Sequence, residues 1–460
     1  MSTRVFRAQR VILPDGERPA TIHVERGRVA RIGAFEDVPD GVAVVEAGAC
    51  TIIPGIVDTH VHVNEPGRTE WEGFETATRA AAAGGVTTIV DMPLNSIPPA
   101  TSERGLAEKA ALTEGRVTVD IGLWGGAVPE NTTGDPRGMK KLLDEGARGF
   151  KCFLVPSGVD EFPNVDEADL EAALLQLRGS GVALMAHAEV AGPIDAAAAS
   201  LREELPPPDS RAYSTYLRSR PPAAEDQAVE LLYRLCKKTG TPVHVVHLGS
   251  AGALQTLRRA RDEGVPLTAE TAPHYLTFLA EEIPDGATWF KCAPPIRERA
   301  HREQLWRGLE EGLVSMVVSD HSPCVPALKK TDEGDFMGAW GGISGLQFGF
   351  AAVWTEARAR GIPLARVLGW MSAAPAAHAG LSDAKGAIAV GRDADFVFFD
   401  PDATFTVDVG HIEHRNKLTP YEGRTLHGVV RSTWLRGERV FDGESFEGKP
   451  SGRWLRWDRR

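Results

Sequence analysis

The chain has 460 residues, which exceeds a typical single domain and predicts either one large domain with an accessory module or two domains. Hydrophobic residues make up 42% of the chain and charged residues 25%, the composition of an ordinary globular protein. The formal net charge is -12 and no basic block offsets it, which argues against a surface for nucleic acid or for an anionic membrane.

We expect neither a membrane-spanning segment nor a signal peptide. The chain has no run of about 18 apolar residues, and residues 1–10 lack an apolar core. The cysteines are odd in number and show no Cys-x-x-Cys spacing, which is typical of free thiols in a reducing compartment. They are Cys50, Cys152, Cys236, Cys292 and Cys324. We therefore predict a cytoplasmic protein.

Both ends of the chain alternate apolar and polar residues between turns, the pattern of short antiparallel strands. We expect strands near 21–24, 28–32, 391–400 and 428–437. The pattern favours one small β-sandwich assembled from both termini, residues 1–54 and 387–460. Two separate β modules are the alternative.

Between these ends the chain alternates strands with helices. Strands are predicted at 51–57, 86–92, 117–123, 149–154, 182–187, 243–248, 266–271 and 314–320. Helices are predicted at 70–83, from about 101, at 138–145, 166–179 and 222–238, up to 264, and at 302–311. Eight strand–helix units predict an α/β fold, a (β/α)8 barrel that spans residues 55–386. A doubly wound sheet is the alternative, but no Gly-x-Gly-x-x-Gly follows the first strand.

Two histidines mark the end of the first predicted barrel strand, in the sequence Asp58-Thr59-His60-Val61-His62. Residues two apart on a strand face the same side, so His60 and His62 present two imidazoles together. This arrangement suits a metal ion such as zinc. A pair of polar residues in a turn is the alternative, and the other candidate ligands decide between them.

Further candidate ligands lie at the ends of other predicted strands: His187, His247 and Asp320. The carboxyl ends of barrel strands meet at one mouth, which carries the active site in folds of this type. Four imidazoles and a carboxylate exceed the three protein ligands of a usual catalytic zinc. The set therefore predicts two metal ions that share a hydroxide.

Lys151 is the polar residue of an otherwise apolar strand. A buried, unpaired ammonium is costly, so such a lysine loses its proton. A neutral amine takes up carbon dioxide to form a carbamate, whose two oxygens can bridge two cations. A lysine that reaches solvent at the mouth or pairs with a carboxylate remains an equal alternative from the residues alone.

Several polar residues near these strand ends have less defined roles. By strand parity His244 faces away from His247, and His321 faces away from Asp320, so we expect packed histidines. His274 follows the seventh strand and could line the site. Asn95 and Ser322 lie on mouth loops, either as substrate contacts or as turn residues.

Six stretches of the sequence carry a resemblance to a known family: 54–74, 91–96, 149–163, 319–323, 341–347 and 416–421. On these residues the chain resembles the amidohydrolase superfamily and, within its cyclic-amidase branch, the allantoinases. The resemblance runs nearly end to end, and the first and third stretches are specific to the subfamily.

The resemblance implies a hydrolase that opens the ring of allantoin to give allantoate, a step in purine degradation. It implies two divalent metal ions, zinc with manganese or cobalt as alternatives, and a homotetramer. The implied ligands are His60, His62, carbamylated Lys151, His187, His247 and Asp320. Asp320 is the expected catalytic residue. Asn95, Ser157, Ser322, Gly341 and Gly342 are the expected substrate contacts.

Two departures separate neighbouring activities. Dihydroorotases carry an arginine two residues after the His-x-His pair, where this chain has Asn64. Hydantoinases and dihydropyrimidinases carry a tyrosine a few residues after the lysine, where this chain has Pro156 and Ser157. Both departures favour allantoin. A hydantoinase or dihydropyrimidinase, and a non-catalytic relative that serves as a scaffold, are the alternatives.

Overall fold

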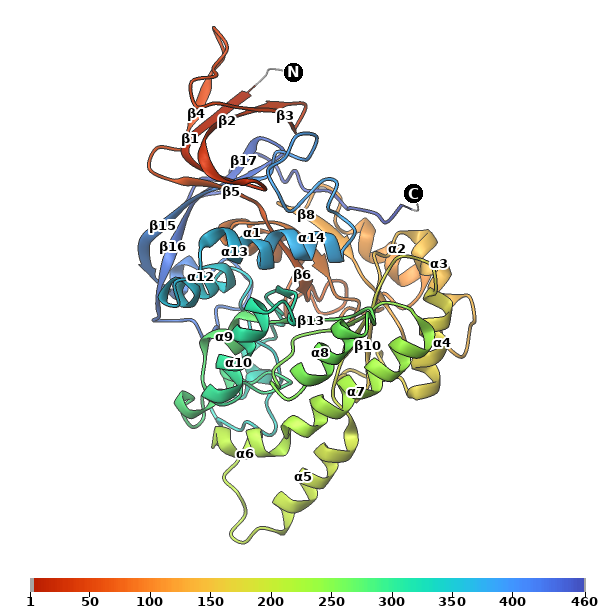
Figure 1. Ribbon diagram of the computed structural model, residues 1–460. Helices are drawn as coiled ribbons and strands as arrows, with labels where there is room; N and C mark the ends of the chain where they lie inside the picture. Colours follow the sequence, from red (N-terminus) through yellow and green to blue (C-terminus); the bar gives the residue numbers. More distant parts are fainter. Residues whose placement is uncertain (1–3, 459–460) are drawn as a thin grey trace.

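A computed structural model of the protein describes residues 4–458. It contains a sheet built from both ends of the chain and, below it in Figure 1, a barrel surrounded by helices. The first N-terminal strands and the last C-terminal strands lie together in the upper part of the view. Residues 1–3 and 459–460, which the predicted terminal unit includes, lie outside the described residues.

The terminal strands form one eight-stranded sheet, in the order β17-β16-β15-β5-β1-β2-β3, with β4 paired to β1. Strand β5 pairs antiparallel with β15, so N-terminal and C-terminal strands share one ladder. This confirms a single composite unit. The strands are β1 Arg4–Leu13, β2 Gly16–Glu25, β3 Arg28–Gly33, β4 Val44–Glu46, β5 Thr51–Pro54, β15 Phe396–Thr406, β16 Thr425–Leu435 and β17 Glu438–Phe441.

The middle of the chain forms the predicted (β/α)8 barrel. Parallel pairs run from β6 to β8 and from β9 to β14. The barrel closes where His62 N donates to His321 O at 2.8 Å and His321 N donates to His60 O at 3.3 Å. The strands are β6 Ile56–Val61, β7 Val86–Asp91, β8 Asp120–Leu123, β9 Gly125–Gly126, β10 Phe150–Phe153, β11 Leu184–His187, β12 Val243–Val245, β13 Leu267–Thr271 and β14 Met316–Val317.

Helices follow the barrel strands and surround them (Figure 1). The α-helices that the sequence predicts are α1 Phe74–Ala83, α2 Glu103–Ala111, α3 Gly138–Glu145, α4 Glu167–Leu177, α7 Pro222–Thr239, α8 Leu254–Asp262 and α10 Arg299–Glu310. Six of these seven helices have a glycine within two residues after their last residue, and Gly146 and Gly240 adopt the left-handed conformation after α3 and α7.

The predicted strand 51–57 is in fact two strands that belong to different units. Thr51–Pro54 lies in the terminal sheet and Ile56–Val61 lies in the barrel. Gly55 separates them, and a Cβ atom at this position would lie 2.0 Å from the Thr87 Oγ1 atom. The close approach requires glycine, and periodicity alone does not reveal it. The division of the chain at 54/55 and 386/387 stays a prediction.

The sequence did not predict several of the helices. Helices α5 and α6 lie between β11 and α7 and extend below the barrel in Figure 1. The alanine-rich α5 buries only Leu201, so it has no apolar stripe to indicate a helix. The remaining elements are α5 Ala191–Glu203, α6 Tyr213–Ser219, α9 Pro273–Thr277, α11 Pro326–Lys329, α12 Gly349–Ala359, α13 Leu364–Leu368, α14 Ala374–His378, the π-helix η3 Gly369–Ala373, and the 3-10 helices η1 Ala280–Glu282, η2 Thr288–Phe290 and η4 Val409–His411.

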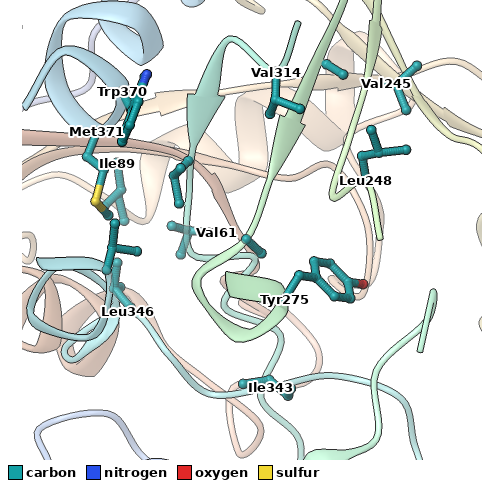
Figure 2. Close-up of a cluster of buried hydrophobic side chains, with 14 of the residues drawn as sticks. Val61, Ile89, Val245, Leu248, Tyr275, Val314, Ile343, Leu346, Trp370 and Met371 are labelled. Carbon is teal, nitrogen blue, oxygen red and sulfur yellow. The ribbon is translucent and has the colours of Figure 1, made fainter. Parts of the chain in front are cut away.

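The apolar core sets the orientation of His60, on β6, and of His62, the residue that follows β6. Val61 is fully buried in a hydrophobic cluster that also contains Ile89, Ile343 and Trp370 (Figure 2). Because neighbouring residues on a strand point to opposite sides, His60 and His62 face away from this cluster.

The buried ammonium group of Lys385 connects the barrel with the terminal sheet. Lys385 Nζ lies 2.5 Å from Asp120 Oδ2, at the start of β8, and 2.7 Å from Asp395 Oδ2, just before β15. Asp393 also contacts Lys385, at 2.9 Å. Arg436 Nη1 completes the network at 2.5 Å from Asp120 Oδ2. The charges compensate one another away from solvent, so the contact fixes the barrel against the terminal sheet.

All five cysteines are free thiols, and only Cys50 is partly exposed. In residues 4–458, no helix has the length and apolar character needed to cross a membrane.

Candidate metal centre and active site

A cavity of about 560 Å³ opens at the carboxyl ends of the barrel strands. Five of the six predicted ligands line it, and His60 lies buried beside them. The five predicted substrate contacts line the same cavity. The lining therefore includes His62, Lys151, His187, His247, Asp320, Asn95, Ser157, Ser322, Gly341 and Gly342.

One group of ligands gathers around Asp320. The Asp320 Oδ1 atom lies 3.2 Å from Nε2 of His60 and 3.7 Å from Nε2 of His62. Each of the three residues offers a ligand atom within 4.8 Å of the others, and all three are buried. Two imidazoles and a carboxylate in this arrangement can hold a divalent transition metal ion.

A second group adjoins the first. Nδ1 of His187 lies 3.0 Å from Nε2 of His247. The ring centroids of His247 and His60 are 5.4 Å apart, so the two groups are close enough for neighbouring ions. Burial, followed by the neighbouring charge of His187, lowers the pKa of His247 well below its usual value. A neutral imidazole is the form that binds a metal ion.

Lys151 contributes its amine to this site from β10. The residue is fully buried, and its Nζ atom lies 4.2 Å from the centroid of the Phe153 ring. Within residues 4–458, no carboxylate oxygen lies within 4 Å of this amine. Burial lowers the pKa of Lys151 to about 8. The Lys151 side chain is thus buried at the cavity wall and forms no ion pair within residues 4–458.

Glu270, on β13, orients His60. Its Oε1 atom accepts a hydrogen bond from Nδ1 of His60 at 2.5 Å, and its Oε2 atom lies 3.0 Å from Nε2 of His244. The bond to Nδ1 leaves Nε2 of His60 buried without a hydrogen-bond partner in residues 4–458. This orphaned nitrogen faces Asp320, as a metal ligand would.

Glu189 orients His187 by a hydrogen bond, as Glu270 orients His60. Its Oε2 atom lies 2.7 Å from Nε2 of His187, so Nδ1 is the nitrogen that faces His247. Arg220 holds Glu189 with two hydrogen bonds, of 3.0 and 2.6 Å. Burial favours the neutral acid, but Arg220 and His187 outweigh it and keep the pKa of Glu189 below its ordinary value. The donor set and its orientation fit two metal ions.

Backbone geometry explains why the predicted strands ran too long at this end of the barrel. Asn95, His247 and Asp320 have φ angles of 70°, 40° and 46°, in the left-handed region that non-glycine residues rarely adopt. Each follows the end of its strand, where the chain turns into a mouth loop. Strained residues of this kind cluster at functional sites.

Three further histidines near the strand ends, His244, His274 and His321, are buried outside the cavity lining. His244 hydrogen-bonds Thr268 at 2.7 Å, and His321 lies 3.3 Å from Glu72, so both are packed histidines as expected. His274 is buried on α9 and does not line the cavity.

The predicted substrate contacts differ in the groups they leave available. Ser322 Oγ donates to Asp320 Oδ1 at 2.9 Å and so orients that carboxylate. Ser157 Oγ donates to Phe162 O at 2.7 Å, which engages its proton within the loop. Gly342 N donates to Lys291 O at 2.8 Å. Oδ1 of Asn95 is buried with no hydrogen-bond partner in the described chain, so it is available to a ligand.

Four residues near the site were not predicted from the sequence: Glu189, Arg220, Glu270 and Lys291. The available signals are the carboxylate of Glu270 within strand β13 and the position of Glu189 two residues after His187. Arg220 and Lys291 also line the cavity, from segments with no motif of their own.

The chain matches the family model of the amidohydrolase family over residues 51–440. It is 50% identical over 453 residues to an allantoinase of Streptomyces avermitilis, with 98% of each chain covered. It is 41% identical to an allantoinase of Saccharomyces cerevisiae, with 96% of each chain covered.

Solved structures of cyclic-amide hydrolases are also similar to this chain. An L-hydantoinase (dihydropyrimidinase) from Arthrobacter aurescens superposes with a TM-score of 0.91 at 28% identity, covering 99% of this chain and 100% of its own. A dihydropyrimidinase from Brevibacillus agri has a TM-score of 0.88 at 28% identity, with 98% of each chain covered. The chain therefore belongs to the amidohydrolase family.

Proposed function

We propose that this protein is an allantoinase, which hydrolyses a ring amide bond of allantoin to give allantoate. The support is the set of curated allantoinases that match nearly the whole chain at 37–50% identity, from bacteria and yeast. The observation that carries the chemistry is the pair of adjoining ligand groups, around Asp320 and around His187 and His247.

The proposed cofactor is a pair of divalent metal ions, with zinc as the expected metal. His60, His62 and Asp320 would hold one ion, and His187 and His247 the other. Lys151, as a carbamate, would bridge the two; its burial and its lack of an ion pair within residues 4–458 support this role. Such ions lower the pKa of water and polarise carbonyl oxygens.

The chain's own groups perform the proton transfers and the positioning. Asp320 takes the proton of the attacking water and returns it to the ring nitrogen that leaves, acting first as base and then as acid. Burial raises the pKa of Asp320, which favours such proton uptake. Ser322 holds the carboxylate in place through its 2.9 Å hydrogen bond. The free Oδ1 of Asn95 would accept a ring N–H.

A homotetrameric assembly and a cytoplasmic location complete the proposal. The assembly rests on the resemblance to the cyclic amidases, and the location rests on the five free thiols.

Hydantoinase or dihydropyrimidinase activity is the second candidate, favoured by the solved neighbours at 27–29% identity. A comparison of allantoin, hydantoin and dihydrouracil as substrates of the metal-loaded protein separates the candidates. We expect kcat/KM for allantoin to exceed that for the other two by at least about tenfold. Equal or faster opening of dihydrouracil would assign the second activity, and no turnover of any of the three would indicate a scaffold.

A further inference from the structure

The segment 328–342, called the loop below, covers one side of the cavity. Two buried lysines hold this loop by hydrogen bonds. Leu328, Met337, Trp340 and Gly342 of this loop line the cavity. The side chains of Lys291 and Lys329 hold the loop through backbone carbonyl groups. The two lysines differ in how many of their N–H groups the protein uses.

Lys329 is saturated by the protein. Its Nζ atom donates to Lys291 O at 3.2 Å, to Trp340 O at 3.1 Å, and to Gly342 O. An ammonium group has three N–H donors, so these three carbonyls engage all of them. Lys329 is buried and is absent from the cavity lining. It fastens the loop and has no donor left for a ligand.

Lys291 has two protein acceptors and lines the cavity. Its Nζ atom donates to Met337 O at 3.1 Å and to Ala339 O at 2.6 Å. The amine lies 4.9 Å from the centroid of the Tyr216 ring, another residue of the cavity wall. The third hydrogen-bonding position of the Lys291 Nζ atom has no partner in residues 4–458.

Both charge states of Lys291 keep one polar position for a ligand. Burial and the positive charges of Lys329 and Arg220 lower the pKa of Lys291 to about 7. The charged form has a third N–H to donate, and the neutral amine has a lone pair to accept. A ligand group that both donates and accepts hydrogen bonds would therefore suit this position at any pH near neutrality.

Allantoin carries such a group. It is a hydantoin ring with a ureido substituent, which presents one carbonyl oxygen and several N–H groups. Hydantoin and dihydrouracil have no counterpart to it. The metal ligands and Lys291 line the same cavity, so a ring held at the ligands can direct its substituent toward the lysine.

We propose that Lys291 is a specificity-determining residue that hydrogen-bonds the ureido group of allantoin. This inference rests on the proposed function and adds the residue that recognises the substituent. A buried polar partner of this kind rejects analogues that lack the matching group, because it is then left without its hydrogen bond.

The test compares two substrates in three proteins. The substrates are allantoin and 5-isobutylhydantoin, which replaces the ureido group by a hydrocarbon branch with the same number of heavy atoms. The proteins are the wild type, Lys291→Met and, as the matched control, Lys329→Met. The readout is the ratio of kcat/KM for the two substrates. Where 5-isobutylhydantoin turns over too slowly, its competitive inhibition constant against allantoin replaces its kcat/KM.

Lys291 also holds the loop, so Lys291→Met can lower both values, but we expect kcat/KM for allantoin to fall at least about tenfold more than the value for 5-isobutylhydantoin. Lys329→Met loosens the loop for both ligands, so both values should fall together. Bound metal and melting temperature are measured in each variant. If Lys291→Met does not fold, Lys291→Gln gives the same readout with a smaller change.

An unchanged ratio in the folded Lys291 variant would overturn the inference and leave Lys291 as a second loop fastener. A wild-type protein that does not open allantoin would instead contradict the proposed function. The two failures are therefore separate results of one experiment.

Discussion

The carboxylate of Glu189 lies 2.7 Å from Nε2 of His187 and turns the other ring nitrogen toward His247. Glu270 and His60 repeat this arrangement with the opposite nitrogen, because Glu270 contacts Nδ1 and leaves Nε2 toward Asp320. Two carboxylates that do not line the cavity thus determine which imidazole nitrogens converge on the site. Such partners orient metal-binding histidines and raise their basicity.

The first prediction concerns this orienting contact. Glu189→Gln removes the charge that faces His187 and Arg220, so the metal ion near His187 and His247 should bind about 10–100-fold more weakly. Competition with a chelator of known affinity measures the change. Glu203→Gln, at the exposed end of α5, is the control. An affinity within twofold of the wild type would show that Glu189 has no role in metal binding.

The second prediction tests the bridging lysine. Lys151→Ala should lose most bound metal and activity, because Lys151 brings the amine of β10 into the cavity that the predicted ligands line. Short carboxylic acids should restore part of the activity by replacing the carbamate oxygens. Metal analysis and turnover with and without added acid give the readout. Two ions per chain and full activity in Lys151→Ala would exclude the bridge.

The third prediction concerns proton transfer. Asp320→Ala, measured with metal in excess, should keep the fold and lower kcat by about 10²–10⁴-fold, the contribution of a general acid–base group. Circular dichroism controls for folding, and metal analysis controls for occupancy. A loss below about tenfold in the metal-replete protein would remove Asp320 as the proton carrier.

The fourth prediction concerns the contact between the barrel and the terminal sheet. Lys385→Met leaves the buried carboxylates of Asp120 and Asp395 without their shared cation, which should lower the free energy of unfolding by about 3–5 kcal/mol. Denaturant titration measures it. The control is Lys238→Met, whose exposed pair with Glu171 should contribute at most about 1 kcal/mol. Equal effects in the two variants would contradict a special role for Lys385.

The sequence predicted the barrel because mainly apolar runs alternate along the chain with helices, most of which are followed closely by a glycine. It also placed His60, His62, Lys151, His187, His247 and Asp320 at one mouth, since strand ends of a parallel barrel converge. The structure brings these residues to one cavity and its border.

Other features could not be predicted, because they depend on contacts between distant segments. Glu270 reaches His60 across 210 residues, and Arg436 reaches Asp120 across 316. No local pattern encodes such pairs. The division of 51–57 into two strands depends on the approach of Thr87 to Gly55, which also appears only in the folded chain. Helix α5 buries only Leu201, so its sequence carries no apolar stripe from which a helix could be predicted.

The most direct measurement is the activity of the metal-free protein during titration with zinc, with allantoin as substrate. The metal is removed with a chelator, and allantoate formation is followed as zinc is added in molar equivalents per chain. Two adjoining ligand groups predict activity that is absent without metal and reaches its plateau near two equivalents. Full activity in the metal-free protein, or no allantoate at any zinc load, would contradict the account.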